Sequence, residues 1–178
     1  MRYFLIALLV LIIGCSRREE PPSDCKNTNT SIFDYELGLT ITGPTLTITC
    51  QYDDCGEWGG HREEIRLVKN NQSSFCLDYQ KDSVNCANIT ELFDGFGFYY
   101  GVKRVPAYGE NSMATDAMKK HIRNFASTMM QSIFEDDFYF SHAGVITTIA
   151  NRDSSLFIQT YSNKADNFNY LKQQLGLK

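Results

Sequence analysis

Apolar residues occupy every second position in several short stretches of this chain, and this spacing restricts the fold more than any other feature. The first stretch covers residues 32–41, and residues 46–50 repeat the pattern after the Gly43-Pro44 turn. Successive side chains of a strand point to opposite faces of a sheet, so a two-residue period predicts half-buried strands. We expect these first two strands to pair as a hairpin.

The later parts of the chain predict two further hairpins and two helices. Residues 65–79 alternate on both sides of the Asn70-Asn71 turn, and residues 145–161 alternate on both sides of a polar turn. Residues 118–134 carry apolar side chains at three- and four-residue steps, which predicts an amphipathic helix that ends near Phe134. Residues 164–175 predict a short final helix.

The order of these elements predicts an α+β fold. We expect a mainly antiparallel sheet of hairpins, one long amphipathic helix packed on one face, and a short C-terminal helix. Residues 85–110 are rich in glycine and aromatic residues and follow neither period, so they predict no particular element.

The first fourteen residues have the composition of a secretory signal peptide. Arg2 supplies a positive start, residues 4–13 are almost wholly apolar, and the small Gly14 precedes Cys15. The apolar run is roughly half of the ~20 residues that a membrane-spanning helix needs. These residues therefore predict an export signal and not a spanning helix.

The tetrapeptide Ile12-Ile13-Gly14-Cys15 resembles the lipobox of bacterial lipoproteins. The resemblance implies cleavage after Gly14 and transfer of a diacylglycerol to the sulfur of Cys15. Two or three acyl chains hold a protein on a membrane lastingly, so we expect a lipid-anchored protein of the bacterial cell envelope. In the enterobacterial pattern, a serine after the lipidated cysteine goes with sorting to the outer membrane, and Ser16 matches this pattern. The resemblance therefore implies a location on the periplasmic side of the outer membrane or at the cell surface. The alternative is an ordinary or uncleaved signal peptide in which Cys15 has no special role.

We expect three regions: a lipoprotein signal peptide at residues 1–14, the lipidated Cys15 with a flexible tether at residues 15–31, and a single domain at residues 32–178. The tether is polar, contains Pro21-Pro22 and has hardly any apolar residue to bury. Loss of Arg2 leaves 16 of the 17 basic residues against 21 acidic ones, a net charge of −5. Nucleic acid is not an expected partner. We expect the chain to associate with the membrane through its lipid anchor, and to bind a protein, a peptide or a glycan.

Export to an oxidising compartment allows the cysteines to form disulfides. Five cysteines remain beside Cys15, so at most two bridges can form, and Cys25 in the tether is our candidate for the unpaired one. Local pairing would join Cys50 to Cys55 and Cys76 to Cys86, and a bridge between Cys50 and Cys76 is the main alternative.

Residues 50–61 hold two thiols, three carboxylates, the single tryptophan and a histidine. Cys50, Cys55 and His61, with Glu57 or Asp53 as a fourth ligand, have the donor types of a zinc site. Their spacing is not that of a structural zinc site, and a disulfide with a glycine-rich turn explains the same residues. We therefore expect no metal and no cofactor.

Three residues of this region, Trp58, His61 and Glu63, are candidates for binding. His61 with Glu63 or Glu64 could act as acid and base, but no nucleophile lies in a recognisable catalytic context. We expect a binding or structural protein and not an enzyme, with a small envelope enzyme or metal-binding module at residues 50–64 as the alternative. The aromatic residues 93–100 could line a groove near Trp58, although packing in the core is their more ordinary role.

Overall fold

The structure is a computed structural model that describes residues 45–69, 74–93, 97–135, 144–151, 156–162 and 165–178. Strands and helices account for most of this part of the chain. In chain order they are β1 (Thr45–Gln51), the 3-10 helix η2 (Gly56–Trp58), β2 (Arg62–Lys69), β3 (Phe75–Phe93), β4 (Phe98–Met113), α1 (Asp116–Glu135), β5 (Val145–Asn151), β6 (Phe157–Ser162) and α2 (Asp166–Leu175).

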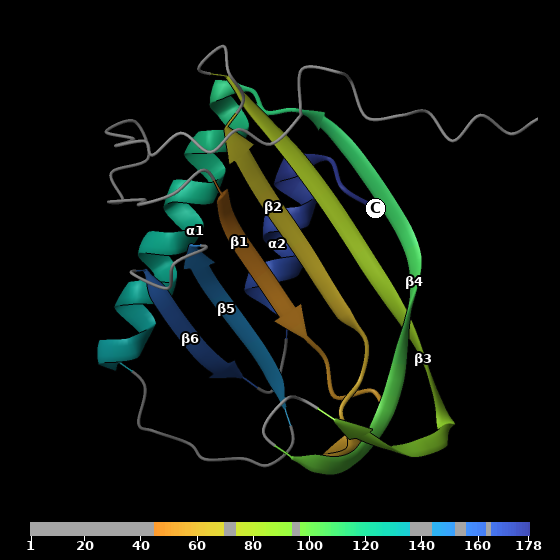
Figure 1. Cartoon of the computed structure of the whole chain (residues 1–178). Helices are drawn as coiled ribbons and strands as arrows, with labels where there is room; N and C mark the ends of the chain where they lie inside the picture. Colours follow the sequence, from red (N-terminus) through yellow and green to blue (C-terminus); the bar gives the residue numbers. More distant parts are fainter. Residues whose placement is uncertain (1–44, 70–73, 94–96, 136–143, 152–155, 163–164) are drawn as a thin grey trace, which may run out of the picture.

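The six strands form one antiparallel sheet in the order β4-β3-β2-β1-β5-β6 (Figure 1). Strand β1 lies in the middle, paired with β2 on one side and with β5 on the other. The predicted hairpins of residues 65–79 and 145–161 are confirmed as β2–β3 and β5–β6. The predicted strand at residues 32–41 lies outside the described residues.

The predicted α+β class is wrong, because the sheet outweighs the helices. The chain is mostly a six-stranded antiparallel sheet, and β3 and β4, of 19 and 16 residues, together hold more residues than the two helices, of 20 and 10. The error comes from residues 85–110, where bulges and glycines hide the strand period. These residues extend β3 and β4 and make the sheet the dominant element.

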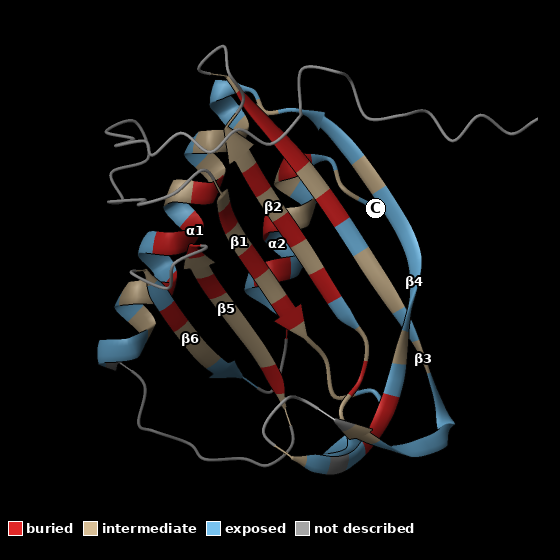
Figure 2. Cartoon of the chain, viewed as in Figure 1, coloured by how far each residue is buried: buried red, intermediate tan, exposed pale blue. Residues whose placement is uncertain are grey.

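One face of the sheet supplies most of the core. The side chains of Leu46, Ile48 and Cys50 are buried, and Figure 2 shows the same alternation along β2. Each fully buried apolar side chain contributes about 1.5–3 kcal/mol. Both helices pack against this face and join the same cluster, through Ile122, Phe125, Ala126 and Met129 of α1 and Phe168, Leu171 and Leu175 of α2.

The two helices begin and end close to their predicted bounds. The apolar side chains of α1 recur at helical spacing, and its last residue, Glu135, is one beyond the predicted end. Gly176 closes α2 with a left-handed conformation at φ 72°, and its N–H donates to Gln173 O at 3.2 Å. Both helices are therefore determined by local sequence.

The far parts of β3 and β4 form a projection that we call the arm, defined as residues 82–93 and 98–106. Pairing continues along it, with register shifts at Lys81/Asp82 and at Val84/Ile89. The second shift leaves residues 85–88 as a bulge in β3, and bulges bend and twist a strand pair. Figure 1 shows the arm running beyond the ends of β1 and β2 and curling at the lower end of the view.

Candidate functional site

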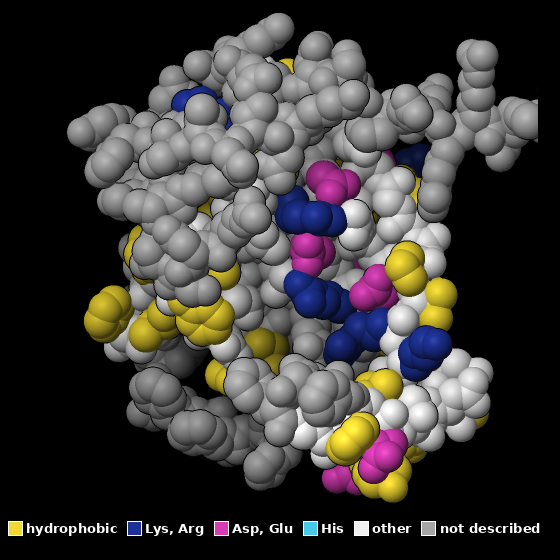
Figure 3. All heavy atoms as spheres, viewed as in Figure 1, with side chains coloured by type: hydrophobic (Ala, Val, Ile, Leu, Met, Phe, Trp, Pro, Cys, Tyr) yellow, Lys and Arg dark blue, Asp and Glu magenta, His cyan; other side chains and the backbone are white. Residues whose placement is uncertain are grey.

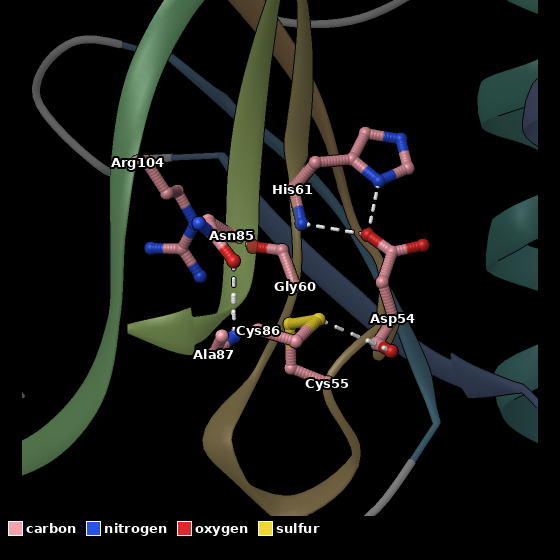
Figure 4. The surroundings of a disulfide bond; sticks show 8 residues. All are labelled: Asp54, Cys55, Gly60, His61, Asn85, Cys86, Ala87 and Arg104. Carbon is pink, nitrogen blue, oxygen red and sulfur yellow. Dashed lines mark hydrogen bonds and ion pairs between the residues drawn. A yellow bond between two sulfur atoms is a disulfide. The ribbon is translucent and has the colours of Figure 1, made fainter. Parts of the chain in front are cut away.

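The loop between β1 and β2, residues 52–61, is closed by its own backbone. Tyr52 N donates to His61 O at 3.0 Å, and Cys55 N donates to Gly59 O at 2.8 Å. A Cβ on Gly60 would collide with Tyr52 O and with Asp54 N, so only glycine fits there. The turn thereby places Asp54 beside His61, and its carboxylate accepts a hydrogen bond from His61 N at 2.9 Å and faces Nδ1 of the same residue (Figure 4).

A disulfide joins this loop to the arm. It links Cys55 to Cys86, which lies in the bulge of β3, and Arg104 on β4 donates through Nε to Gly60 O at 2.8 Å (Figure 4). The predicted local pairings, Cys50 with Cys55 and Cys76 with Cys86, are wrong because the sheet brings Cys55 and Cys86 together across 31 residues. The disulfide and the Arg104 hydrogen bond therefore attach the arm to the loop.

Cys50 is the free cysteine of the described residues, which also rules out its pairing with Cys76. Burial raises the pKa of the Cys50 thiol to about 11, so the group is a neutral thiol near neutral pH. Cys76 is also disulfide-bonded. The predicted unpaired cysteine, Cys25, lies outside the described residues.

The proposed zinc ligands do not form a common site. Cys55 is held in the disulfide and cannot supply a thiolate, and His61 faces Asp54 on one side of its ring and Glu63 on the other. In the part of the chain that the structure describes, no three His, Cys, Asp or Glu side chains gather as metal ligands would.

Glu63 is the centre of the polar cluster in this region. Its side chain is only 1% exposed and lies on the core face of β2, and the register pairs Glu63 with Cys50 of β1. Four groups surround the carboxylate: Lys172 Nζ of α2 at 2.5 Å, Tyr79 OH at 2.8 Å, Lys81 Nζ at 3.0 Å and His61 Nε2 at 3.3 Å. A buried carboxylate is costly without partners, and here two cations and a hydroxyl compensate it.

The ionisation of the cluster follows from these contacts. Burial opposes the charge on Glu63, but hydrogen bonds from Lys172, Lys81 and Tyr79 outweigh it and hold the pKa of the carboxyl below its ordinary range. The pKa of Asp54 is also lowered, since contacts with His61 outweigh its burial. Both groups are therefore carboxylates near neutral pH.

Aromatic contacts connect the cluster to α2. Tyr52 stacks on His61 with the ring centroids 4.0 Å apart, and its hydroxyl donates to Asn169 Oδ1 at 3.2 Å. Burial raises the pKa of Tyr52 well above its ordinary value, so the hydroxyl stays protonated and can donate. The cluster thus joins the loop, the sheet and the C-terminal helix.

The structure brings together two of the three candidate binding residues. His61 and Glu63 meet at 3.3 Å, but Glu63 is enclosed by its partners, and Trp58 lies on η2 with 39% of its surface exposed. Sequence reasoning did not identify Tyr79, Lys81 and Lys172 as partners of Glu63. One signal was available in the sequence. Leu67 and Ile65 alternate with polar residues, and a further step of two residues towards the N-terminus places Glu63 on the same buried face.

A second feature is an exposed apolar surface on the arm. The register pairs Ile89 with Val102 and Glu91 with Tyr100, so alternation puts Ile89, Phe98 and Tyr100 on one face. Phe98 is 72% exposed and Tyr100 is 64% exposed, and core packing is therefore the wrong role for both rings. Arg104, on the same face of β4, reaches the loop that carries Trp58, and η2 lies against β4. We call Ile89, Phe98 and Tyr100, together with Trp58 of the loop that is linked to the arm, the aromatic surface of the arm.

Comparison with models of known protein families, with curated proteins and with solved structures found no match to this chain. Among the described residues, neither helix has the length and apolar character needed to span a membrane.

Proposed function

We propose that this protein is a lipid-anchored protein of the bacterial cell envelope whose folded domain acts by binding. The anchor is proposed at Cys15, on the resemblance of Ile12-Ile13-Gly14-Cys15 to a lipobox. The tether of residues 15–31, at about 3.1 Å per residue when extended, would let the domain stand away from the membrane.

The observation that carries the binding proposal is the exposure of the aromatic surface of the arm. Large aromatic side chains are enriched at protein interfaces, where they supply contact area at low entropic cost. Here Phe98 and Tyr100 are exposed on β4, and the Cys55–Cys86 disulfide links the arm to the loop. A surface held in place before binding loses less conformational entropy when a ligand arrives.

The anchor is tested by metabolic labelling of the full chain with an alkyne-bearing fatty acid in a bacterium that expresses it. Wild type and the matched Cys50→Ala variant should be labelled and stay with the membranes. Cys15→Ser should lose both the label and the membrane association. Persistent labelling of Cys15→Ser would overturn the proposed anchor.

Binding is tested in the same cells with a photoreactive phenylalanine analogue at position 98. We expect a discrete cross-linked adduct after irradiation. The control is the same analogue at Tyr170, which is 63% exposed on α2 and lies outside the aromatic surface. Absence of an adduct at position 98, or equal adducts at both positions, would contradict binding through the arm.

A further inference from the structure

Acidic side chains accompany the aromatic surface of the arm. Glu91 is exposed and pairs with Tyr100 across the two strands, and the exposed Glu57 directly precedes Trp58. Asp53 and Asp54 lie in the same loop as Trp58. Figure 3 shows acidic and hydrophobic side chains together at the lower end of the molecule, where the arm lies.

The basic residues of the same region are fewer than the acidic ones. Lys103 and Tyr100 are an odd number of residues apart on β4, so their side chains project from opposite faces of the strand. Arg104 lies on the same face as Tyr100 and donates through Nε to Gly60 O, an uncharged acceptor, so its single positive charge stays on this face. The described residues of the loop and the arm hold five acidic side chains, Asp53, Asp54, Glu57, Asp82 and Glu91, against Lys103 and Arg104, and only Asp54 of the five faces His61.

We infer that the aromatic surface of the arm binds a partner protein that presents an apolar patch edged by Lys and Arg side chains. This inference rests on the proposed binding function and adds the kind of partner. Rings at the centre of an interface supply most of the contact energy. Carboxylates at its edge attract a basic partner, speed its association and disfavour acidic competitors.

The charge also argues against the other occupants of this surface. In a symmetric dimer the same patch would meet itself, so Glu57 and Glu91 would lie among the carboxylates of the second copy. A neutral glycan would stack on the rings and donate hydroxyl hydrogen bonds to the carboxylates, but it would gain no attraction between opposite charges. A basic protein surface uses both features.

The test uses the full chain in cells, with the photoreactive analogue at position 98 and charge reversal at the edge. Glu57→Lys combined with Glu91→Lys should lower the adduct yield about tenfold, since two attractions become repulsions. The matched control is Asp166→Lys, which reverses an exposed acidic residue on α2 and should leave the yield unchanged. Circular dichroism of the purified variants checks that each is folded.

The outcomes separate this inference from the proposed function. The inference is supported if a protease digests the cross-linked partner and if the partner peptides joined to position 98 are rich in Lys and Arg. Three results would overturn the inference and leave binding through the arm intact. The adduct could be insensitive to charge reversal, it could contain only this chain, or a muramidase and not a protease could release the cross-linked partner. No adduct at all overturns both.

Discussion

Lys172 Nζ on α2 lies 2.5 Å from Oε2 of Glu63 on β2, which joins the last helix to the middle of the sheet through a carboxylate that is 1% exposed. Tyr79 and Lys81 complete the contacts from the neighbouring strand. Removing one partner of a buried ion pair leaves the other charge unsatisfied, so this cluster is sensitive to single substitutions.

Glu63→Gln should lower the free energy of unfolding by about 2–4 kcal/mol, because Lys172 and Lys81 would keep their charges without a counter-ion. The matched control is Glu64→Gln on the other face of β2, whose partners Arg62 and Arg66 are 44% and 35% exposed. Exposed pairs contribute little, so we expect a loss below about 1 kcal/mol there. Urea unfolding of both variants measures the difference, and equal losses would contradict the role of Glu63.

Stability should fall in acid through Glu63. Its pKa is lowered in the folded state, so its contribution is complete above the unfolded-state pKa of about 4.3 and is lost as pH drops through the lower folded-state pKa. Asp78 acts with the opposite sign, because burial raises its pKa. The difference between wild type and Glu63→Gln, measured by urea unfolding from pH 7 to pH 3, isolates Glu63. It should be constant above pH 5 and shrink below pH 4.

The Cys55–Cys86 bridge should stabilise the domain. Its partners are separated by 31 residues, for which the loop-entropy model predicts about 3–4 kcal/mol. The Cys55→Ser, Cys86→Ser double variant should therefore unfold at lower urea, and hydrogen exchange should quicken in the arm more than in β1. Uniform quickening along the sheet would argue against a specific attachment of the arm.

Cys50 should be unreactive in the folded protein. Its thiol is buried and its pKa is raised to about 11, so little thiolate forms at pH 8 and reagents cannot reach it. We expect N-ethylmaleimide to modify Cys50 only after denaturation, with the residue located by mass spectrometry of its peptide. Cys50→Ala, which lacks this modified peptide, serves as the control. Rapid modification in native buffer would be inconsistent with this burial.

Gly60→Ala should lower the thermal midpoint, because its Cβ would meet Tyr52 O and Asp54 N, and backbone atoms cannot move as a flexible side chain can. Overpacking of this kind costs about 1–3 kcal/mol. Gly97→Ala is the matched control, since nothing lies within 4 Å of its added Cβ. Calorimetry of both variants should show a loss only for Gly60→Ala.

The candidate site could be predicted only in part. The sequence offered Glu63 or Glu64 as a partner of His61 and left the choice open, and the structure places Glu63 beside the histidine ring. Lys172 could not be found in this way, because it is more than a hundred residues from Glu63 and reaches it only after α2 packs on the sheet. The arm was missed because its bulge breaks the two-residue period on which strand prediction depends.

The sequence by itself determined where the regular strands and helices form, because burial of alternating or helically spaced side chains depends on neighbours within a few residues. It predicted the hairpins of residues 65–79 and 145–161 and the extent of α1 for this reason. Only the tertiary structure decided that Cys55 bonds to Cys86, that Lys172 neutralises Glu63 and that Phe98 and Tyr100 face solvent. Each of these depends on strand register and helix docking, which bring together residues that no local pattern relates.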